Sequence, residues 1–382
     1  MRSYEPMYHV GCLDVEFGGA HAGCSYKVYY PTNLKPKWGF WRRPANVETW
    51  RAYWGMLVFQ ANAQRWNVAA RALAWAFCFV VWTIFRVLAT LEAREDAPLI
   101  ESEEGLDVVA FSHGLAGFAT CNAGLACELA RRGIVVFAID HADGSATVSK
   151  RANSSGVQWN LYVPNGGKFE ARRAQTTTRL AEIASCADVI DALNRGETST
   201  KNLLATRNNV NLHSMFRGRL KVDSKTLMGF SFGGGSAVVA SANIDTFARV
   251  VVLDAWLEFM TDLECLERAC RIPTLSVISE KWGTNARTEN KHVLTRGKNR
   301  TFCEIEVPGS KHHCFSDVSF FFGAMKKVIG MVGSVDTRTF HAFNAEIIAT
   351  FVRSSSAASL DDELRRVIAE YDSSLPGATL RR

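Results

Sequence analysis

One serine of this sequence lies in a setting that can turn its hydroxyl group into a nucleophile. Residues 226–230 form a short apolar run, and Gly229 to Gly233 match the pattern G-x-S-x-G with Ser231 at the centre. Small residues suited to a helix follow at 236–241. At a tight turn from strand to helix the serine is held outward, and the amino end of the helix favours negative charge nearby. The pattern therefore predicts a serine that attacks a carbonyl carbon.

A serine nucleophile needs a base and an acid, and both residue types occur after Ser231. His312 lies in a loop that follows the last strand-like run, and Asp254 ends a hydrophobic run 23 residues after the serine. The order serine, acid, histidine is typical of hydrolases with a nucleophile at a strand-to-helix turn. Glu280 also follows a strand-like run and could orient the histidine equally well. The residues alone therefore leave Asp254 and Glu280 as alternatives for the acid.

The turn at His113 and Gly114 could complete such a site. It follows the apolar run 106–111, and in α/β-hydrolases a turn at this place supplies a backbone N–H group that binds the negatively charged oxygen of the reaction intermediate. An ordinary glycine loop is the alternative. We interpret His113, His141 and His313 as structural histidines.

The elements that must position these residues follow one pattern from residue 106 onward. Buried apolar runs alternate with helix-length segments, which is typical of a mostly parallel sheet covered by helices. The predicted strands are 106–111, 134–139, 226–229, 250–253, 273–278 and 302–307. A helix is predicted over 169–193, ended by Gly196, and the runs 8–17 and 24–30 predict an antiparallel hairpin. The fold class is therefore α/β: an α/β-hydrolase fold with a mostly parallel central sheet, flanking helices and an N-terminal antiparallel hairpin.

Taken together, these stretches resemble the platelet-activating factor acetylhydrolases of the plasma and intracellular type II group. The resemblance runs from about residue 8 to residue 352. The stretches that carry it are Val10–Asp14, Tyr29–Pro31, Phe111–Leu115, Asp143–Ala146, Ser231–Gly234, Leu253–Trp256 and Gly309–His312. Their order and spacing together are highly specific. The site residues that the resemblance implies are Ser231 as nucleophile, Asp254 as acid, His312 as base, and the backbone N–H groups of Leu115 and Phe232 as the oxyanion hole.

The resemblance favours Asp254 over Glu280, and it has one departure. The family usually has a histidine directly before the nucleophile, whereas this chain has Phe230. A side chain at that position can touch the substrate pocket, so the departure bears on substrate preference and not on the three catalytic candidates.

The resemblance implies a serine esterase that hydrolyses the sn-2 acetyl or short-chain acyl ester of phospholipids such as platelet-activating factor, oxidised chains included. The reaction would pass through an acyl-enzyme, without calcium, metal or cofactor. Two alternatives stay open. One is a general carboxylesterase or lipase that acts on neutral esters, and the other is a catalytically inactive relative that binds membranes.

Composition limits the partners of the chain. Of its 382 residues 47% are hydrophobic, which is typical of a folded protein. Its 44 basic and 38 acidic residues give a net charge of +6, too weak to indicate a nucleic-acid partner. We predict a single domain over 1–352 and a peripheral tail over 353–382, with a short helix whose capping box begins at Ser359. The oligomeric state is not predicted.

Cysteine usage and the N-terminus indicate a cellular compartment. The ten cysteines include no C-x-x-C pair and no zinc-ligand spacing, which favours reduced thiols. The first residues lack the basic and apolar run of a secretory signal. Both observations predict a cytoplasmic protein.

The segment 35–92 is basic, holds seven of the ten tryptophans and contains the apolar run 72–85 between Arg71 and Arg86. That run of 14 residues is short of the roughly 20 that cross a bilayer. A helix lying in the headgroup region is therefore favoured, with a buried core helix and a membrane anchor as alternatives. In the family that this chain resembles, a basic and aromatic region before the first core strand touches lipid, and residues 50–90 occupy the corresponding place. The candidate membrane-contact residues are Trp75, Phe79, Trp82 and Phe85.

Overall fold

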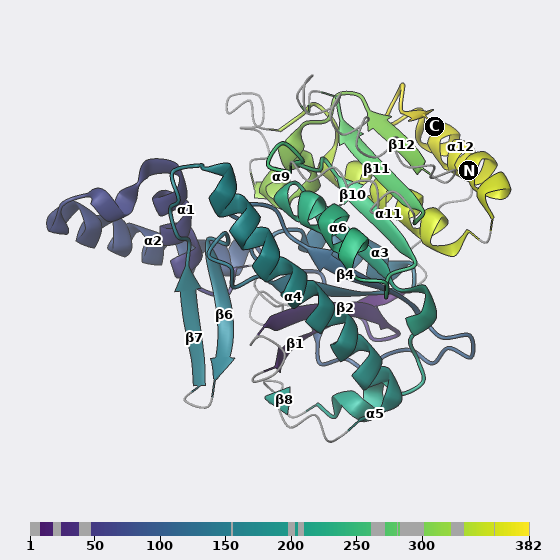
Figure 1. Ribbon diagram of the computed structural model, residues 1–382, viewed down its shortest axis with the longest axis horizontal. Coiled ribbons are helices and arrows are strands. Elements are labelled where there is room, and N and C mark those ends of the chain that lie inside the picture. Colours follow the sequence, from purple (N-terminus) through teal and green to yellow (C-terminus); the bar gives the residue numbers. More distant parts are fainter. Residues whose placement is uncertain are drawn as a thin grey trace.

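The computed structural model describes residues 8–17, 24–37, 47–153, 156–197, 203–204, 210–260, 272–280, 282, 302–321, 332–354 and 356–381. Eleven strands form its central sheet. They are β1 (His9–Phe17), β2 (Ser25–Thr32), β3 (Arg94–Glu95), β4 (Asp107–Ser112), β5 (Ile134–Asp140), β8 (Leu203–Leu204), β9 (Thr226–Phe230), β10 (Arg249–Leu253), β11 (Thr274–Ser279), β12 (Phe302–Val307) and β13 (Thr379–Arg381). Their order is β13-β12-β11-β10-β9-β4-β5-β2-β1-β3, and β8 pairs with β1 (Figure 1).

The predicted fold class is confirmed. The strands β5, β4, β9, β10, β11 and β12 are parallel, and each begins within one residue of its predicted start. The hairpin of β1 and β2 is antiparallel and joins the sheet beside β5. The molecule is thus an α/β protein with a mostly parallel sheet and an N-terminal antiparallel hairpin.

The helices of the described residues are α1 (Arg51–Ala61), α2 (Val68–Leu88), α3 (Ala123–Arg131), α4 (Phe169–Arg195), α5 (Leu212–Phe216), α6 (Phe232–Asn243), α9 (Val318–Phe321), α11 (Thr337–Arg353) and α12 (Ala357–Tyr371). Among them α3, α4, α6 and α11 cover the two faces of the sheet. The helix predicted over 169–193 is α4, and Gly196 ends it in the left-handed conformation with φ 68°. Figure 1 shows α4 and α6 on the side of the sheet that faces the viewer.

The two faces of the sheet explain why the predicted strands are continuous apolar runs. In β4, Val108 and Ala110 pack into the cluster that includes α4 and α6, whereas Val109 and Phe111 pack into the cluster that includes α3 and α11. Successive side chains of a strand point to opposite faces, so a strand covered on both sides must be apolar at every position. Apolar burial on both faces therefore holds the carboxyl ends of the strands in fixed positions.

The strand order reverses at β4. The chain continues from β4 to β5 on one side, and β9 later joins β4 on the other side. In open α/β sheets a crevice forms outside the carboxyl ends of the strands at such a point. The loop after β4 and the loop after β9 meet there, and these loops carry Leu115 and Ser231.

The helices α1 and α2 form an arm beside the sheet (Figure 1). Trp54 and Val58 of α1 pack with Ala74 and Cys78 of α2 and with Tyr162 in a small cluster separate from the main core. Next to the arm lies a separate hairpin of β6 (Val148–Asn153) and β7 (Gly156–Leu161). The segment predicted over 35–92 thus holds the arm, while its residues 38–46 lie outside the described residues.

The tail over 353–382 contains the expected short helix, α12, but it is not peripheral. Leu360 and Leu364 are buried in the main core, and β13 pairs with β12 as an edge strand of the sheet. The predicted cap at Ser359 is also wrong by three residues, because the side chain of Ser356 accepts the backbone N–H of Ser359. The apolar positions of α12 therefore extend the core.

Candidate active site

Ser231 lies at the turn between β9 and α6, where the sequence pattern predicts it. Its backbone has φ 55° and ψ −118°, a conformation that residues other than glycine rarely adopt. A Cβ atom at Gly229 would lie 2.2 Å from the carbonyl oxygen of Gly233, and one at Gly233 would lie 2.1 Å from the carbonyl oxygen of Ser112. Both glycines are therefore required, since they let the first turn of α6 pack against β9 and β4 and so place the serine at the sheet edge.

Ser231, His312 and Asp254 form a hydrogen-bonded chain. The Oγ atom of Ser231 lies 3.0 Å from Nε2 of His312, and Nδ1 of His312 lies 3.1 Å from Oδ2 of Asp254. A carboxylate only accepts hydrogen bonds, so Nδ1 carries the imidazole proton and Nε2 can accept the serine proton. The structure thus brings together the three residues that the sequence singles out, from the ends of β9 and β10 and from the loop after β12.

The structure also separates the two candidate acids. Asp254 is fully buried, and Ser279 donates its backbone N–H to Oδ1 at 2.7 Å and its hydroxyl to Oδ2 at 2.6 Å. Glu280 is exposed, and its carboxylate accepts the backbone N–H of Gly309 at 2.6 Å. Asp254 therefore contacts the histidine. Glu280 instead connects the end of β11 to the loop that contains His312.

The His312 ring is stacked between two aromatic side chains. Its centroid lies 3.7 Å from the Trp282 indole at an interplanar angle of 10°, and 4.7 Å from the Phe230 ring at 29°. Two rings this close and this nearly parallel must occupy opposite faces of the imidazole. Trp282 is fixed by a hydrogen bond from Nε1 to the carbonyl oxygen of Ala255 at 3.2 Å. Phe230, which stands where the family that the chain resembles usually has a histidine, thus packs on the ring of His312.

The sequence reasoning missed Trp282. We expect Trp282→Ala to lower kcat on a soluble ester about 10-fold, because the electron-rich indole face stabilises the imidazolium that forms during the reaction by about 1–2 kcal/mol. Trp282→Phe should keep most of the activity. The check is kcat for p-nitrophenyl acetate, with Trp66→Ala, a partly exposed tryptophan of the arm, as the matched control. An unchanged kcat in Trp282→Ala would show that the indole does not support the base.

The two backbone groups expected in the oxyanion hole flank the serine. Phe232 is the first residue of α6, and Leu115 follows Gly114, where a Cβ atom would lie 3.1 Å from Cβ of Ser231. Among the described residues no protein acceptor takes the N–H of Leu115 or of Phe232. Both N–H groups are therefore available to an oxygen on the substrate carbonyl.

The three histidines interpreted as structural lie around this site. His113 and His141 are fully buried. Burial, and after it the neighbouring His312, lowers the pKa of His313 to about 4, so this ring is neutral at pH 7. The described part of the chain holds no cluster of residues suited to a metal ion.

The four membrane-contact candidates on α2 differ in exposure. Trp75 and Phe79 are exposed, at 44% and 52% of their surface. Trp82 and Phe85 are half-buried, with Nε1 of Trp82 donating to the carbonyl oxygen of Val47 at 3.1 Å and Phe85 packed on Tyr53. Only two of the four candidates are therefore exposed.

The helix α2 is longer than its uncharged run. Asn67 caps its amino end, and α2 then continues for 21 residues through Arg71 and Arg86. Within the described residues, Val68–Arg86 is the helical stretch long and apolar enough to cross a membrane by length and composition, yet only 11% of its 18-residue window is buried. The alternative of a buried core helix is therefore wrong.

The sheet, the strained serine at the strand-to-helix turn and the hydrogen-bonded histidine and aspartate together define a serine hydrolase of the α/β-hydrolase class. A ferulic acid esterase from Streptomyces cinnamoneus shares the fold, with a TM-score of 0.60 at 17% sequence identity. That match covers 100% of this chain and 98% of the esterase.

Sequence comparison narrows the class to a family. The family described as platelet-activating factor acetylhydrolase, isoform II, matches residues 1–367. The chain belongs to this family, which confirms the resemblance found in the sequence. It is 24% identical over 350 residues to the platelet-activating factor acetylhydrolase of Canis lupus familiaris, covering 86% of this chain and 71% of that protein. The same enzyme of Gallus gallus is 25% identical over 348 residues, covering 86% of this chain and 76% of the relative.

Proposed function

We propose that this protein is a serine esterase that hydrolyses the sn-2 acetyl or short-chain acyl ester of phospholipids such as platelet-activating factor, oxidised chains included. The observation that carries the proposal is the hydrogen-bonded chain from Ser231 through His312 to Asp254. Membership of the acetylhydrolase family supports the choice of substrate.

The proposed reaction begins when Nε2 of His312 takes the hydroxyl proton of Ser231 and Oγ attacks the ester carbonyl carbon. The N–H groups of Leu115 and Phe232 bind the oxyanion of the tetrahedral intermediate, and Asp254 holds the imidazolium. His312 then donates the proton to the leaving alcohol oxygen, which leaves an acyl group on the serine. Water, deprotonated by the same histidine, then attacks the acyl carbon. The bond from this carbon to Oγ of Ser231 breaks, His312 returns the proton to Oγ, and the acid leaves. Every step uses these residues and water, so we expect turnover without calcium.

Chain length at the sn-2 position gives the direct test. We expect kcat/KM for an sn-2 acetyl phosphatidylcholine to exceed that for the sn-2 palmitoyl analogue by at least about 100-fold, since even one misplaced methylene changes rates by about 10–200-fold. The measurement is release of the sn-2 acid in the presence of EDTA. The control is Ser231→Ala.

Two other results would overturn parts of the proposal. Hydrolysis of a neutral triacylglycerol but of neither phospholipid would favour a general carboxylesterase or lipase, with the nucleophile retained. No turnover of any ester, together with no labelling of Ser231 by a fluorophosphonate, would favour a catalytically inactive membrane-binding relative.

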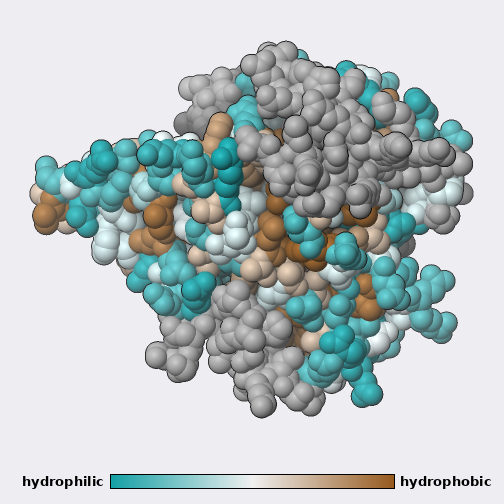
Figure 2. Space-filling view, viewed as in Figure 1, coloured by the Kyte–Doolittle hydropathy of each residue, from teal (hydrophilic) through white to brown (hydrophobic). Residues whose placement is uncertain are grey.

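We further propose that the protein is cytoplasmic and associates with membranes through the outer face of α2. Leu73, Phe77, Val80 and Ile84 follow each other at steps of four, three and four residues and are 73%, 63%, 54% and 51% exposed. Steps of this size place side chains on one face of a helix. Figure 2 shows hydrophobic residues on the surface of the arm.

The packing of the opposite face supports a helix that lies on the membrane. Ala74 and Cys78 are buried against α1, and Trp82 bonds to Val47, so α2 is attached to the protein along its length. Arg71 and Arg86 are exposed near the two ends of the helix, where they can reach phospholipid headgroups.

Removing the outer apolar face should release the protein from vesicles. We expect the double change Leu73→Ser and Phe77→Ser to weaken partitioning onto phosphatidylcholine vesicles containing phosphatidylserine by about 30-fold, equal to about 2 kcal/mol of lost apolar burial. Co-sedimentation with vesicles is the measurement. The activity on p-nitrophenyl acetate should not change, since the face lies away from Ser231. Leu34→Ser, at another exposed leucine, is the control, and equal partitioning of all three proteins would sink the proposed surface.

A further inference from the structure

Arg179 of α4 is a buried charge that the proposed mechanism does not use. Its side chain is 0% exposed, so it contacts no substrate. Its Nε donates to Oδ2 of Asp143 at 2.9 Å, and Nη2 donates to Oγ of Ser145 at 2.7 Å. Burial opposes ionisation of Asp143, but the guanidinium of Arg179 helps to outweigh it and the pKa of the carboxyl is lowered to about 2. The pair is therefore charged and fixed in place.

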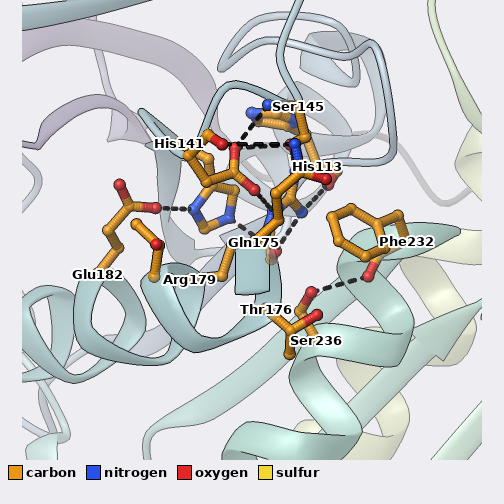
Figure 3. Close-up of polar contacts among 12 residues, drawn as sticks. His113, His141, Ser145, Gln175, Thr176, Arg179, Glu182, Phe232 and Ser236 are labelled. Carbon is orange, nitrogen blue, oxygen red and sulfur yellow. Dashed lines mark hydrogen bonds and ion pairs between the residues drawn. The ribbon is translucent and has the colours of Figure 1, made fainter. Parts of the chain in front are cut away.

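The remaining contacts of Arg179 reach both halves of the expected oxyanion hole. Nη1 donates to the carbonyl oxygen of His113 at 2.6 Å, two residues before Leu115. The guanidinium carbon lies 4.5 Å from the centre of the Phe232 ring. Figure 3 shows the guanidinium between the loop after β4 and the first turn of α6. One side chain thus contacts the elements that carry the two N–H donors.

The same group holds the loop on the other side of Leu115. Ala116 has φ 55° and donates its backbone N–H to the carbonyl oxygen of Ser145 at 2.8 Å. Ser145 accepts from Arg179 and donates its hydroxyl to Asp143 at 2.6 Å. Leu115 therefore lies between two residues that Arg179 holds in place. Arg179 binds the carbonyl oxygen of His113 directly and holds the N–H of Ala116 through Ser145.

A second buried chain fixes Arg179 itself. Nη1 also donates to Oγ of Ser112 at 3.3 Å, and this hydroxyl lies 2.7 Å from Nε2 of His141. Nδ1 of His141 lies 2.6 Å from the carboxylate of Glu182, which is three residues after Arg179 on α4. The chain runs from α4 through β4 and back to α4, so the guanidinium has little freedom to move.

We infer that Arg179 is the positioning residue of the oxyanion hole, because it sets the distance between the N–H groups of Leu115 and Phe232. The inference rests on the proposed function of these two groups. Arg179 acts on the transition state and not on substrate binding, since all its contacts are to protein groups that surround the donors.

The test uses the purified full chain and p-nitrophenyl acetate, a soluble ester whose turnover does not depend on membrane binding. We expect Arg179→Met to lower kcat by about 10²–10³-fold, as the loss of one oxyanion donor does, with KM within about threefold of wild type. The inhibition constant of a trifluoromethyl ketone, whose adduct with the serine places an oxyanion in the hole, should rise by a similar factor. Arg179→Lys keeps the charge but not the planar guanidinium, whose three nitrogens reach separate acceptors, so its loss should be near 10-fold.

A matched control separates positioning from general stability. Arg132 is mostly buried and pairs with Glu128 and Glu346 at the carboxyl end of α3. It lies just before β5 and so at the amino ends of the strands, whereas the candidate site lies at their carboxyl ends. Arg132→Met should lower the midpoint of thermal unfolding while kcat stays within about threefold. Should Arg179→Met not fold, Ser145→Ala decides the question with an expected loss near 10-fold.

The outcomes separate this inference from the proposed function. A folded Arg179→Met with wild-type kcat, or one with lower kcat but unchanged affinity for the ketone, overturns the positioning role alone. Wild-type kcat in Ser145→Ala does the same. A wild-type protein that hydrolyses no ester and takes up no fluorophosphonate overturns the proposed function and this inference with it.

Discussion

Asp254→Asn should lower kcat on p-nitrophenyl acetate by about 10⁴-fold, the loss that an asparagine causes in serine proteases. The carboxylate accepts the proton-bearing Nδ1 of His312 at 3.1 Å and two hydrogen bonds from Ser279. An asparagine keeps the shape but can present an N–H₂ group to Nδ1, which moves the imidazole proton to Nε2. That nitrogen then cannot accept the proton of Ser231. The measurement is kcat, together with the rate at which a fluorophosphonate labels the serine.

Glu280→Gln is the matched control for this prediction, because Glu280 is the other acid that the sequence allows. Its carboxylate binds the N–H of Gly309 and not the histidine. The amide oxygen of glutamine can still accept this N–H, so we expect kcat of Glu280→Gln to stay within about threefold of wild type. A large loss in Glu280→Gln combined with near wild-type activity in Asp254→Asn would exchange the two roles.

Much of the fold could be predicted from the sequence, because the strands of a parallel sheet covered on both faces consist of continuous apolar runs. The starts of β4, β5 and β9 follow from such runs within one residue. The edge strand β13 has no such signal, since its three residues are Thr, Leu and Arg with two of them exposed. It exists because β12 offers unpaired backbone groups to it, which only the assembled sheet provides.

The uncharged run 72–85 is shorter than the helix α2 that contains it. Arg71 and Arg86 bound the uncharged run in the sequence, but a helix ends where its backbone is capped and not where a charge occurs. Both arginines extend into solvent from a continuing helix. The polarity of single residues therefore gives poor helix boundaries at an exposed surface.

The candidate site divides in the same way. Ser231, Asp254 and His312 follow strand ends, and the carboxyl ends of parallel strands share one edge of the sheet, so their meeting could be predicted. Trp282 and Arg179 support the site through contacts with residues 30 or more positions away in the sequence. Neither residue belongs to a sequence motif, although the helix that carries Arg179 could be predicted. Their roles depend on tertiary contacts that the spacing of residues does not encode.

Ser231→Ala and Ser231→Gly should both lower kcat by about 10⁶-fold, since each removes the nucleophile and with it the acyl-enzyme route. The residual kcat values of the two variants should be similar, because neither alanine nor glycine has a group that can attack the ester. Release of acetate from the sn-2 acetyl phospholipid measures this loss. A variant that keeps a tenth of the activity would place the nucleophile elsewhere.

The same two variants should differ in stability, in the direction opposite to the ordinary effect of glycine. At φ 55° and ψ −118° a residue with a Cβ atom carries a strain of about 1–3 kcal/mol, which glycine relieves. Glycine loses about 0.5–1 kcal/mol through the greater freedom of the unfolded chain. Ser231→Gly should therefore be more stable than Ser231→Ala by about 1 kcal/mol in urea unfolding, whereas Ala237→Gly, inside α6, should destabilise the protein by about the same amount. A glycine variant less stable than the alanine variant would mean that the turn holding the nucleophile is not strained, and that the position of Ser231 at the sheet edge comes from the close approach of α6 to β9 and β4 alone.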